Sequence, residues 1–188
     1  GLGVGTILSL VCSALGYDMA SLNPLVSYLL PILPAFIYIF AGKKSADSVP
    51  LENGKFGDIS PFLVYPMVAV AILALGFVTE PLSSWLPMPD SIKQVFEKIL
   101  SGSVWAFITT VIAAPVVEEF LLRGVMERGL LKHTTPLQAI LWSSFFFAVI
   151  HMNPWQALPA FIMGVLFGYV YYKTGSLKLT MLMHFANN

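Results

Sequence analysis

The fold of this chain is decided by one long apolar stretch in its second half, residues 103–131, which reads SVWAFITTVIAAPVVEEFLLRGVMERGLL. The stretch is longer than the roughly 20 apolar residues that a helix needs to cross a bilayer. It nevertheless carries Glu118, Glu119 and Arg123 in its interior. Because ionisable residues inside a membrane are costly, we expect each of them to have a partner or a chemical purpose.

The rest of the chain has the same apolar character. Of its 188 residues, 57% are hydrophobic and only 11% are charged, whereas soluble domains are about half apolar and about a quarter charged. The 10 basic and 10 acidic residues cancel, so the net charge gives no attraction to nucleic acid, and we expect no such partner. The single cysteine, Cys12, excludes a disulfide framework and a cysteine zinc knuckle.

Apolar stretches on both sides of residues 103–131 predict further membrane-spanning helices. They comprise residues 2–15, 24–40 and 61–78 on the N-terminal side, and residues 136–151, 155–172 and a helix from residue 177 onward on the C-terminal side. Asp90 is a typical N-cap, and the residues that follow it predict an amphipathic helix in the membrane interface, ending near residue 102. Residues 174–176 predict a turn, and Gly164 and Gly168 predict a close-packing helix face.

We therefore predict an all-α, polytopic transmembrane bundle with about seven spans. It forms a single domain, with the N-terminal spans and the interfacial helix in residues 1–102 and the polar motifs in residues 103–188. Such a protein would be a multi-pass integral protein of a bacterial inner membrane or its equivalent, with the lipid bilayer as its surroundings. Because the sequence begins and ends inside apolar runs, we expect further helical residues at both ends.

Helix geometry separates the two glutamates. Glu119 and Arg123 are four residues apart with the acid first, so their side chains meet on one face. Glu118 points about 100° away around the helix and lacks this partner. We therefore predict a structural Glu119–Arg123 ion pair, which leaves Glu118 available as a general base. Pro115 cannot donate to the carbonyl of Val111, so we also expect the helix to bend or hydrate there.

Further polar residues stand in the later apolar stretches. His184 and Asn188 are four residues apart and project on one helix face, where two neutral donors could form an oxyanion hole. His151 precedes a helix-ending Asn-Pro pair and is predicted at the mouth of a span. Taken alone it fits an interfacial histidine, but beside Glu118 and His184 it becomes a candidate catalytic group.

These residues resemble the motifs of the CPBP family of intramembrane endopeptidases, which includes CAAX prenyl proteases and bacteriocin-processing or self-immunity proteins. The family's EExxxR motif stands at residues 118–123, its FxxxH motif at residues 147–151 and its HxxxN motif at residues 184–188. The three motifs stand in the family's order, and the resemblance covers residues 103–188.

The resemblance implies a glutamate-dependent protease that cleaves a membrane-embedded or lipidated protein or peptide. By this carry-over, Glu118 and His151 activate a water that attacks the peptide carbonyl, and His184 and Asn188 stabilise the oxyanion. Phe147 is a candidate wall of the substrate pocket. No metal and no other cofactor are expected.

Two alternative functions use the same residues. Glu118, His151 and His184 could form a site with two histidines and one carboxylate for zinc, although no HExxH-type pair lies on one helix. The chain could instead be a non-catalytic membrane scaffold or a bacteriocin immunity protein. The intact motif set disfavours that second alternative.

Overall fold

A computed structural model of the protein describes residues 16, 23–41, 56, 59–83, 87–90, 93, 94, 97, 103–151 and 153–188. Within these residues the chain is helical and contains no strand, so the predicted all-α class is confirmed for them. The predicted span at residues 2–15 and most of the predicted interfacial helix at residues 90–102 lie outside the described residues.

The apolar stretch that decides the fold forms one continuous helical segment, as predicted. It comprises α6 (Val104–Phe107), η2 (Ile108–Ala113), α7 (Ala114–Glu119), η3 (Phe120–Glu127) and α8 (Arg128–Leu130), where η denotes π-helical turns. Among the described helices, this segment alone is long and apolar enough to cross a membrane. Pro61–Phe77 and Pro136–Ile150 are apolar but shorter. The described helices therefore show one candidate span and do not show the predicted seven.

The C-terminal helices begin and end within two residues of the predicted bounds. They are α9 (Pro136–Ile150), α10 (Pro154–Thr174) and α11 (Leu177–Asn187). Thr135 caps α9 through a capping box with Gln138, and the Asn153 side chain accepts from the first turn of α10. Gly175 ends α10 with φ of 64°, a left-handed conformation that favours glycine. The predicted turn at residues 174–176 is therefore confirmed.

The N-terminal spans differ from the prediction. The stretch predicted as one span at residues 24–40 is divided into α2 (Pro24–Leu29) and α3 (Leu33–Ala41). The interruption falls at Pro31, which lacks an N–H and whose ring clashes with the preceding helical turn. The third predicted span is longer than expected, because α4 (Pro61–Ser83) continues past Glu80. A charged residue ends an apolar stretch but does not end a helix.

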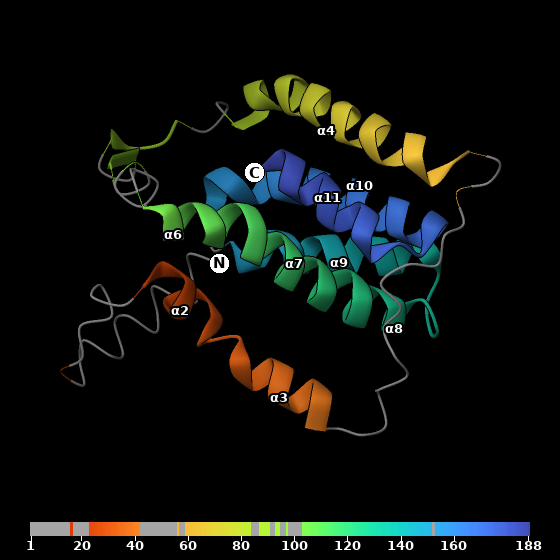
Figure 1. The fold of residues 1–188 in the computed structure, drawn as a ribbon, viewed down its shortest axis with the longest axis horizontal. Coiled ribbons are helices and arrows are strands. Elements are labelled where there is room, and N and C mark those ends of the chain that lie inside the picture. Colours follow the sequence, from red (N-terminus) through yellow and green to blue (C-terminus); the bar gives the residue numbers. More distant parts are fainter. Residues whose placement is uncertain are drawn as a thin grey trace.

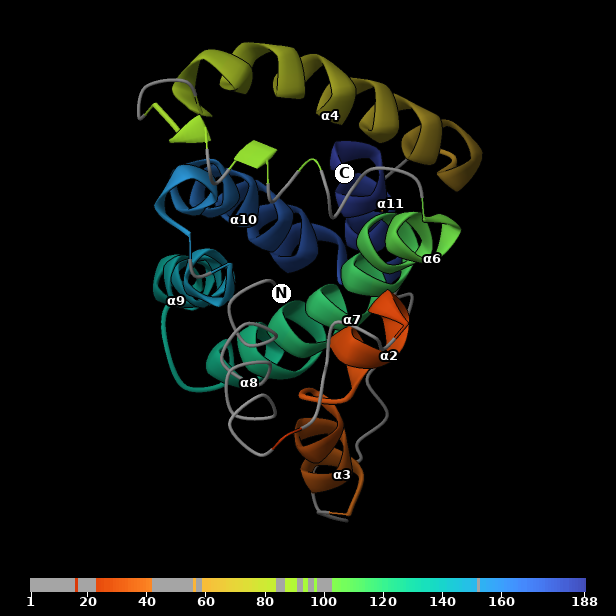
Figure 2. The same cartoon turned by 90° about the vertical axis from the view of Figure 1, so that its left-hand side faces the viewer.

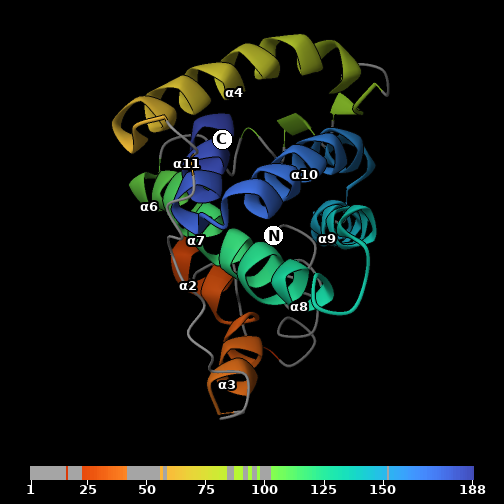
Figure 3. The ribbon, with the colours of Figure 1, turned by 90° about the vertical axis from the view of Figure 1, so that its right-hand side faces the viewer.

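α4 and the α2–α3 pair cover opposite sides of the bundle (Figure 1). α4 packs against α10 and α11, whereas α2 packs against α6 and η2. The two end views show the same order, with α4 above α10 and α11 and with α3 furthest from it (Figure 2, Figure 3). The motif-bearing helices therefore lie between these covers. The buried core between them comprises Ile72, Leu122, Phe147, Ala148, Ala160, Met163, Phe167, Leu179 and Met183.

Two glycines allow α9 and α10 to approach closely, as their spacing predicts. A Cβ added to Gly164 would lie 3.1 Å from the Cα of Ser144 and 3.2 Å from Cδ1 of Phe147. A Cβ added to Gly168 would lie 3.2 Å from Cγ2 of Ile140 in α9 and 2.8 Å from Oε2 of Glu127 in η3. Small residues at these two positions are therefore a condition for the observed packing.

We expect Gly164→Ala to lower the free energy of unfolding by about 1–3 kcal/mol, because the new methyl group overpacks the contact with the α9 backbone. The matched control is Gly129→Ala in α8, where nothing lies within 4 Å of the added Cβ. That change should be neutral or stabilising by up to about 1 kcal/mol. Denaturant titration of both purified variants in detergent micelles measures the difference, and equal stabilities would contradict the packing argument.

Candidate active site

An ion pair that is completely withdrawn from solvent lies at the centre of the motif region. Nη1 of Arg123 lies 3.1 Å from Oε1 of Glu119, and both side chains are 0% exposed. The pair joins residues four apart on one helix, as the sequence predicts. Placing two charges in a low-dielectric interior is costly unless their remaining polar atoms are also bound. The further contacts of Arg123 are therefore part of the site.

Arg123 binds two other helices besides its own. Its Nη2 donates to the carbonyl of Gly164 in α10 at 3.0 Å. Its guanidinium carbon also lies 4.8 Å from the ring centre of Phe147 in α9 and 5.6 Å from that of Phe167 in α10. A cation over aromatic faces is stabilised electrostatically, most of all where water is excluded. Arg123 thus fixes α9 and α10 against the EExxxR motif.

His184 connects both glutamates. Its Nδ1 lies 3.1 Å from Oε1 of Glu119, and its Nε2 lies 4.0 Å from Oε2 of Glu118. A carboxylate only accepts, so Nδ1 of His184 donates a hydrogen bond to Glu119 and Nε2 is the nitrogen that faces Glu118. Glu119 thus contacts the histidine of the HxxxN motif as well as its predicted partner Arg123.

Glu118 is buried, with 6% of its surface exposed. Its Oε1 accepts a hydrogen bond from the hydroxyl of Tyr28 in α2 at 3.0 Å. Glu118 therefore has a partner other than Arg123. Helix geometry separates Glu118 from Arg123, as predicted, but a helix from elsewhere in the chain supplies a donor that spacing within one helix cannot reveal.

His151 follows the last residue of α9 and is partly buried, which agrees with its predicted place at a helix end. Its Nδ1 lies 2.7 Å from the carbonyl oxygen of Phe147. A carbonyl only accepts, so Nδ1 carries the proton and Nε2 is the basic nitrogen of the neutral ring. Glu118 and His184 are near enough to His151 to act on it electrostatically.

Phe147 lies between the two histidines. Its ring centre is 5.0 Å from that of His151 and 5.2 Å from that of His184, and both contacts are edge-on. The side chain is 2% exposed. It therefore holds the two imidazoles apart, and its predicted contact with a substrate stays a prediction.

Asn188 contacts the motif helix about two turns before the glutamates. Its Nδ2 donates to the carbonyl of Thr110 at 2.8 Å. The backbone N–H of Ala114 donates to Thr109, five residues back, and the next residue, Pro115, has no N–H. The π-helical turn before the proline therefore leaves the Thr110 carbonyl available to Asn188. Asn188 itself is exposed, whereas His184 is 3% exposed.

Sequence reasoning missed two polar groups of this region. Tyr28 lies 90 positions before Glu118 in the sequence, and no local pattern joins the two. Glu127 is 0% exposed, and its Oε2 accepts from the hydroxyl of Ser143 at 2.8 Å. A signal for Glu127 did exist, because it stands four residues after Arg123 and so lies on the same helix face.

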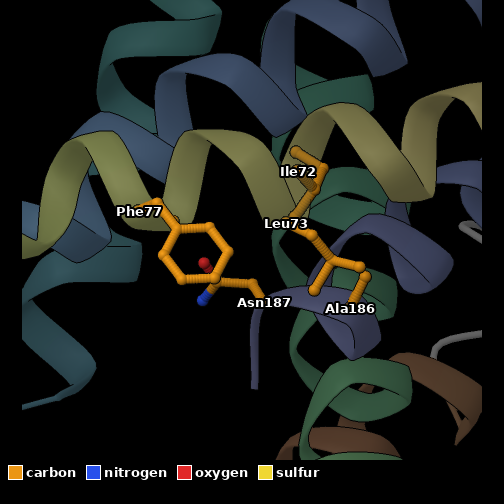
Figure 4. A pocket seen from close by; sticks show the side chains of 6 residues that line it. Ile72, Leu73, Phe77, Ala186 and Asn187 are labelled. Atoms are coloured by element: carbon orange, nitrogen blue, oxygen red, sulfur yellow. The ribbon is translucent and has the colours of Figure 1, made fainter.

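The motif residues form no metal site within the described part of the chain. No three His, Cys, Asp or Glu side chains there could hold a metal ion together. A cavity of about 260 Å³ lies between α4 and α11, on the side of α11 that faces α4 (Figure 4). It is lined by Ile72, Leu73, Gly76, Phe77, Ala186 and Asn187, and by none of the predicted site residues.

A comparison with known protein families finds a match for the part of the chain that carries the three motifs. Residues 100–188 match the sequence model described as type II CAAX prenyl endopeptidase, Rce1-like. The resemblance to this family that the three motifs predicted is therefore confirmed for residues 100–188. Similarity to this family indicates a membrane-associated protease. Comparisons with curated proteins and with solved structures found no match.

The Rce1-like motif helix gives a prediction for Glu119. Glu119→Gln should lower the free energy of unfolding by about 3–5 kcal/mol, because it leaves the buried guanidinium of Arg123 without its carboxylate. The matched control is Glu97→Gln, because the Glu97 side chain is exposed; it should change stability by no more than about 0.5 kcal/mol. Denaturant titration in micelles measures both variants. Equal effects would contradict the buried ion pair.

Proposed function

We propose that the protein is an intramembrane endopeptidase that uses Glu118 and His151 to activate water. The observation that carries the proposal is the convergence of Glu118, Glu119 and His184 from two helices of the Rce1-like segment. His184 lies 3.1 Å from one carboxylate and 4.0 Å from the other. The 4.0 Å between Nε2 of His184 and Oε2 of Glu118 is too long for a direct hydrogen bond. A water or a substrate oxygen that contacts both atoms can therefore bridge them.

In the proposed reaction, a carboxylate oxygen of Glu118 takes a proton from water while the water oxygen attacks the scissile carbonyl carbon. The Nε2 of His151, whose Nδ1 is bound to the Phe147 carbonyl, holds the same water as an acceptor. The tetrahedral intermediate then collapses, the C–N bond breaks, and the proton held by Glu118 passes to the leaving amine. The products are a new carboxyl terminus and a new amino terminus, and Glu118 returns to its starting state.

We assign oxyanion stabilisation to His184 and Asn188. The Nδ1 of His184 donates to Glu119, so a proton on Nε2 makes the ring a cation that is flanked by two carboxylates. A cationic donor is stronger than a neutral one at a developing negative charge. Asn188 contributes the second N–H of its amide, because the first donates to Thr110. This assignment gives Glu119 a chemical task in addition to its ion pair.

We further propose a multi-pass membrane location and a membrane-embedded or lipidated substrate. The outward faces of α4 and α9 support the location, because they expose large apolar side chains that water would disfavour. These include Phe62, Met67, Val70, Phe77, Leu137, Trp142 and Phe145. A substrate that is itself held in the bilayer reaches such a protein without crossing water.

Glu118→Gln tests the reaction. We expect it to reduce cleavage by at least about a thousandfold, because the amide accepts no proton from water. Quantitative mass spectrometry of new peptide termini, in membranes from cells that carry either chain, measures the loss and identifies the substrate. Glu97→Gln, at an exposed site, is the control and should retain activity. Identical termini with wild type and Glu118→Gln, both folded and expressed, would refute the reaction and favour the scaffold or immunity function.

Metal dependence is tested separately. We propose a reaction that needs no metal, so treatment with a zinc chelator should leave the cleavage rate unchanged. Elemental analysis of the purified protein should show much less than one zinc per chain. Loss of activity on chelation that zinc restores, together with about one bound zinc, would replace this mechanism by the zinc-dependent one.

A further inference from the structure

The hydrogen bond from Tyr28 to Glu118 joins the proposed general base to the part of the chain outside the Rce1-like match. Tyr28 lies in α2 (Pro24–Leu29), whereas the match begins at residue 100. The phenol oxygen lies 3.0 Å from Oε1 of Glu118, and Tyr28 is partly buried. A hydroxyl that donates to a carboxylate in a water-poor place makes a strong, charge-assisted hydrogen bond.

Other contacts fix the position from which Tyr28 donates. The side chain of Asn23 caps α2 by accepting from the N–H of Leu25, and α2 packs against α6 and η2. In the helix that follows, the ring of Phe36 stacks on Phe120, with ring centres 5.7 Å apart and planes 13° apart. α2 and α3 thus contact the motif helix on both sides of the glutamates, so the phenol is held by packing as well as by its own bond.

The two oxygens of Glu118 consequently have different neighbours. Oε1 faces the phenol of Tyr28, and Oε2 faces Nε2 of His184 at 4.0 Å. A carboxylate rotates about its last bond unless one oxygen is fixed. A donor on Oε1 therefore determines which oxygen is presented to the histidine.

We propose that Tyr28 is a positioning residue for Glu118, and this inference rests on the function proposed above. Tyr28 contacts neither water nor substrate in the proposed reaction. It acts by holding the carboxylate of Glu118 with Oε2 directed at His184. α2 then belongs to the active site, although it lies outside the Rce1-like match.

Tyr28→Phe tests the inference, because it removes the hydroxyl and keeps the ring. We expect kcat to fall about tenfold to a hundredfold, the effect of losing one hydrogen bond to a charged group, with KM little changed. The matched control is Tyr38→Phe in α3, since Tyr38 is 82% exposed; its kcat and KM should equal those of wild type. Unfolding midpoints of all three chains in micelles show whether the fold is retained.

A second measurement is independent of proteolysis. A carboxyl oxygen adds to the central carbon of a hydrophobic carbodiimide, and peptide mass spectrometry counts the adduct at Glu118. Removing the Tyr28 hydroxyl should increase that adduct, because Oε1 of Glu118 is then no longer occupied by the phenol, whereas Tyr38→Phe should not change it.

Each outcome bears on one of the two proposals. Unchanged labelling in Tyr28→Phe, or an unchanged kcat, would overturn the positioning function of Tyr28. Increased labelling in a chain whose wild type cleaves nothing would keep the contact between Tyr28 and Glu118 and would refute the protease function instead.

Discussion

The buried charge of Arg123 is the constraint on which the rest of the structure depends. No part of its side chain reaches solvent, and removing a guanidinium from water costs several kcal/mol unless its neighbours replace the lost hydration. Its carboxylate partner comes from one turn earlier, its carbonyl partner from α10 and its aromatic neighbours from α9 and α10. Arg123 thus requires α9, α10 and its own helix to meet at one place. The packing of α9 also brings His151 to this region.

The π-helical turns have a related effect on the motif helix. A regular α-helix through residue 115 would place the proline ring against a carbonyl of the preceding turn. The wider turn of η2 (Ile108–Ala113) avoids this clash, and it leaves the Thr110 carbonyl for Asn188. The helical irregularity and the last motif residue therefore depend on each other. Such π-helical segments are frequent at functional sites because they redirect side chains without ending the helix.

Contacts within one helix were predictable from sequence, and contacts between helices were not. The Glu119–Arg123 pair follows from a spacing of four residues, and the helix ends follow from Pro136, Asn153 and Gly175. The Glu119–His184 contact joins residues 65 positions apart, so it exists only once α11 has packed against α7. The hydrogen bond from Tyr28 to Glu118 likewise joins residues 90 positions apart, so it exists only once α2 has packed against the motif helix. The break at Pro31 did have a local signal, but an uninterrupted apolar composition concealed it.

The neighbouring glutamates show how burial alone fails to distinguish a structural carboxylate from a chemical one. Both are almost fully buried, with 6% of Glu118 and 0% of Glu119 exposed. Oε1 of Glu119 is shared between the guanidinium of Arg123 and the imidazole of His184. Glu118 instead accepts from the hydroxyl of Tyr28 in α2, and its second oxygen lies 4.0 Å from Nε2 of His184. The two carboxylates therefore differ in the neighbours of each oxygen and not in burial, and Glu119 is the one that holds the buried guanidinium.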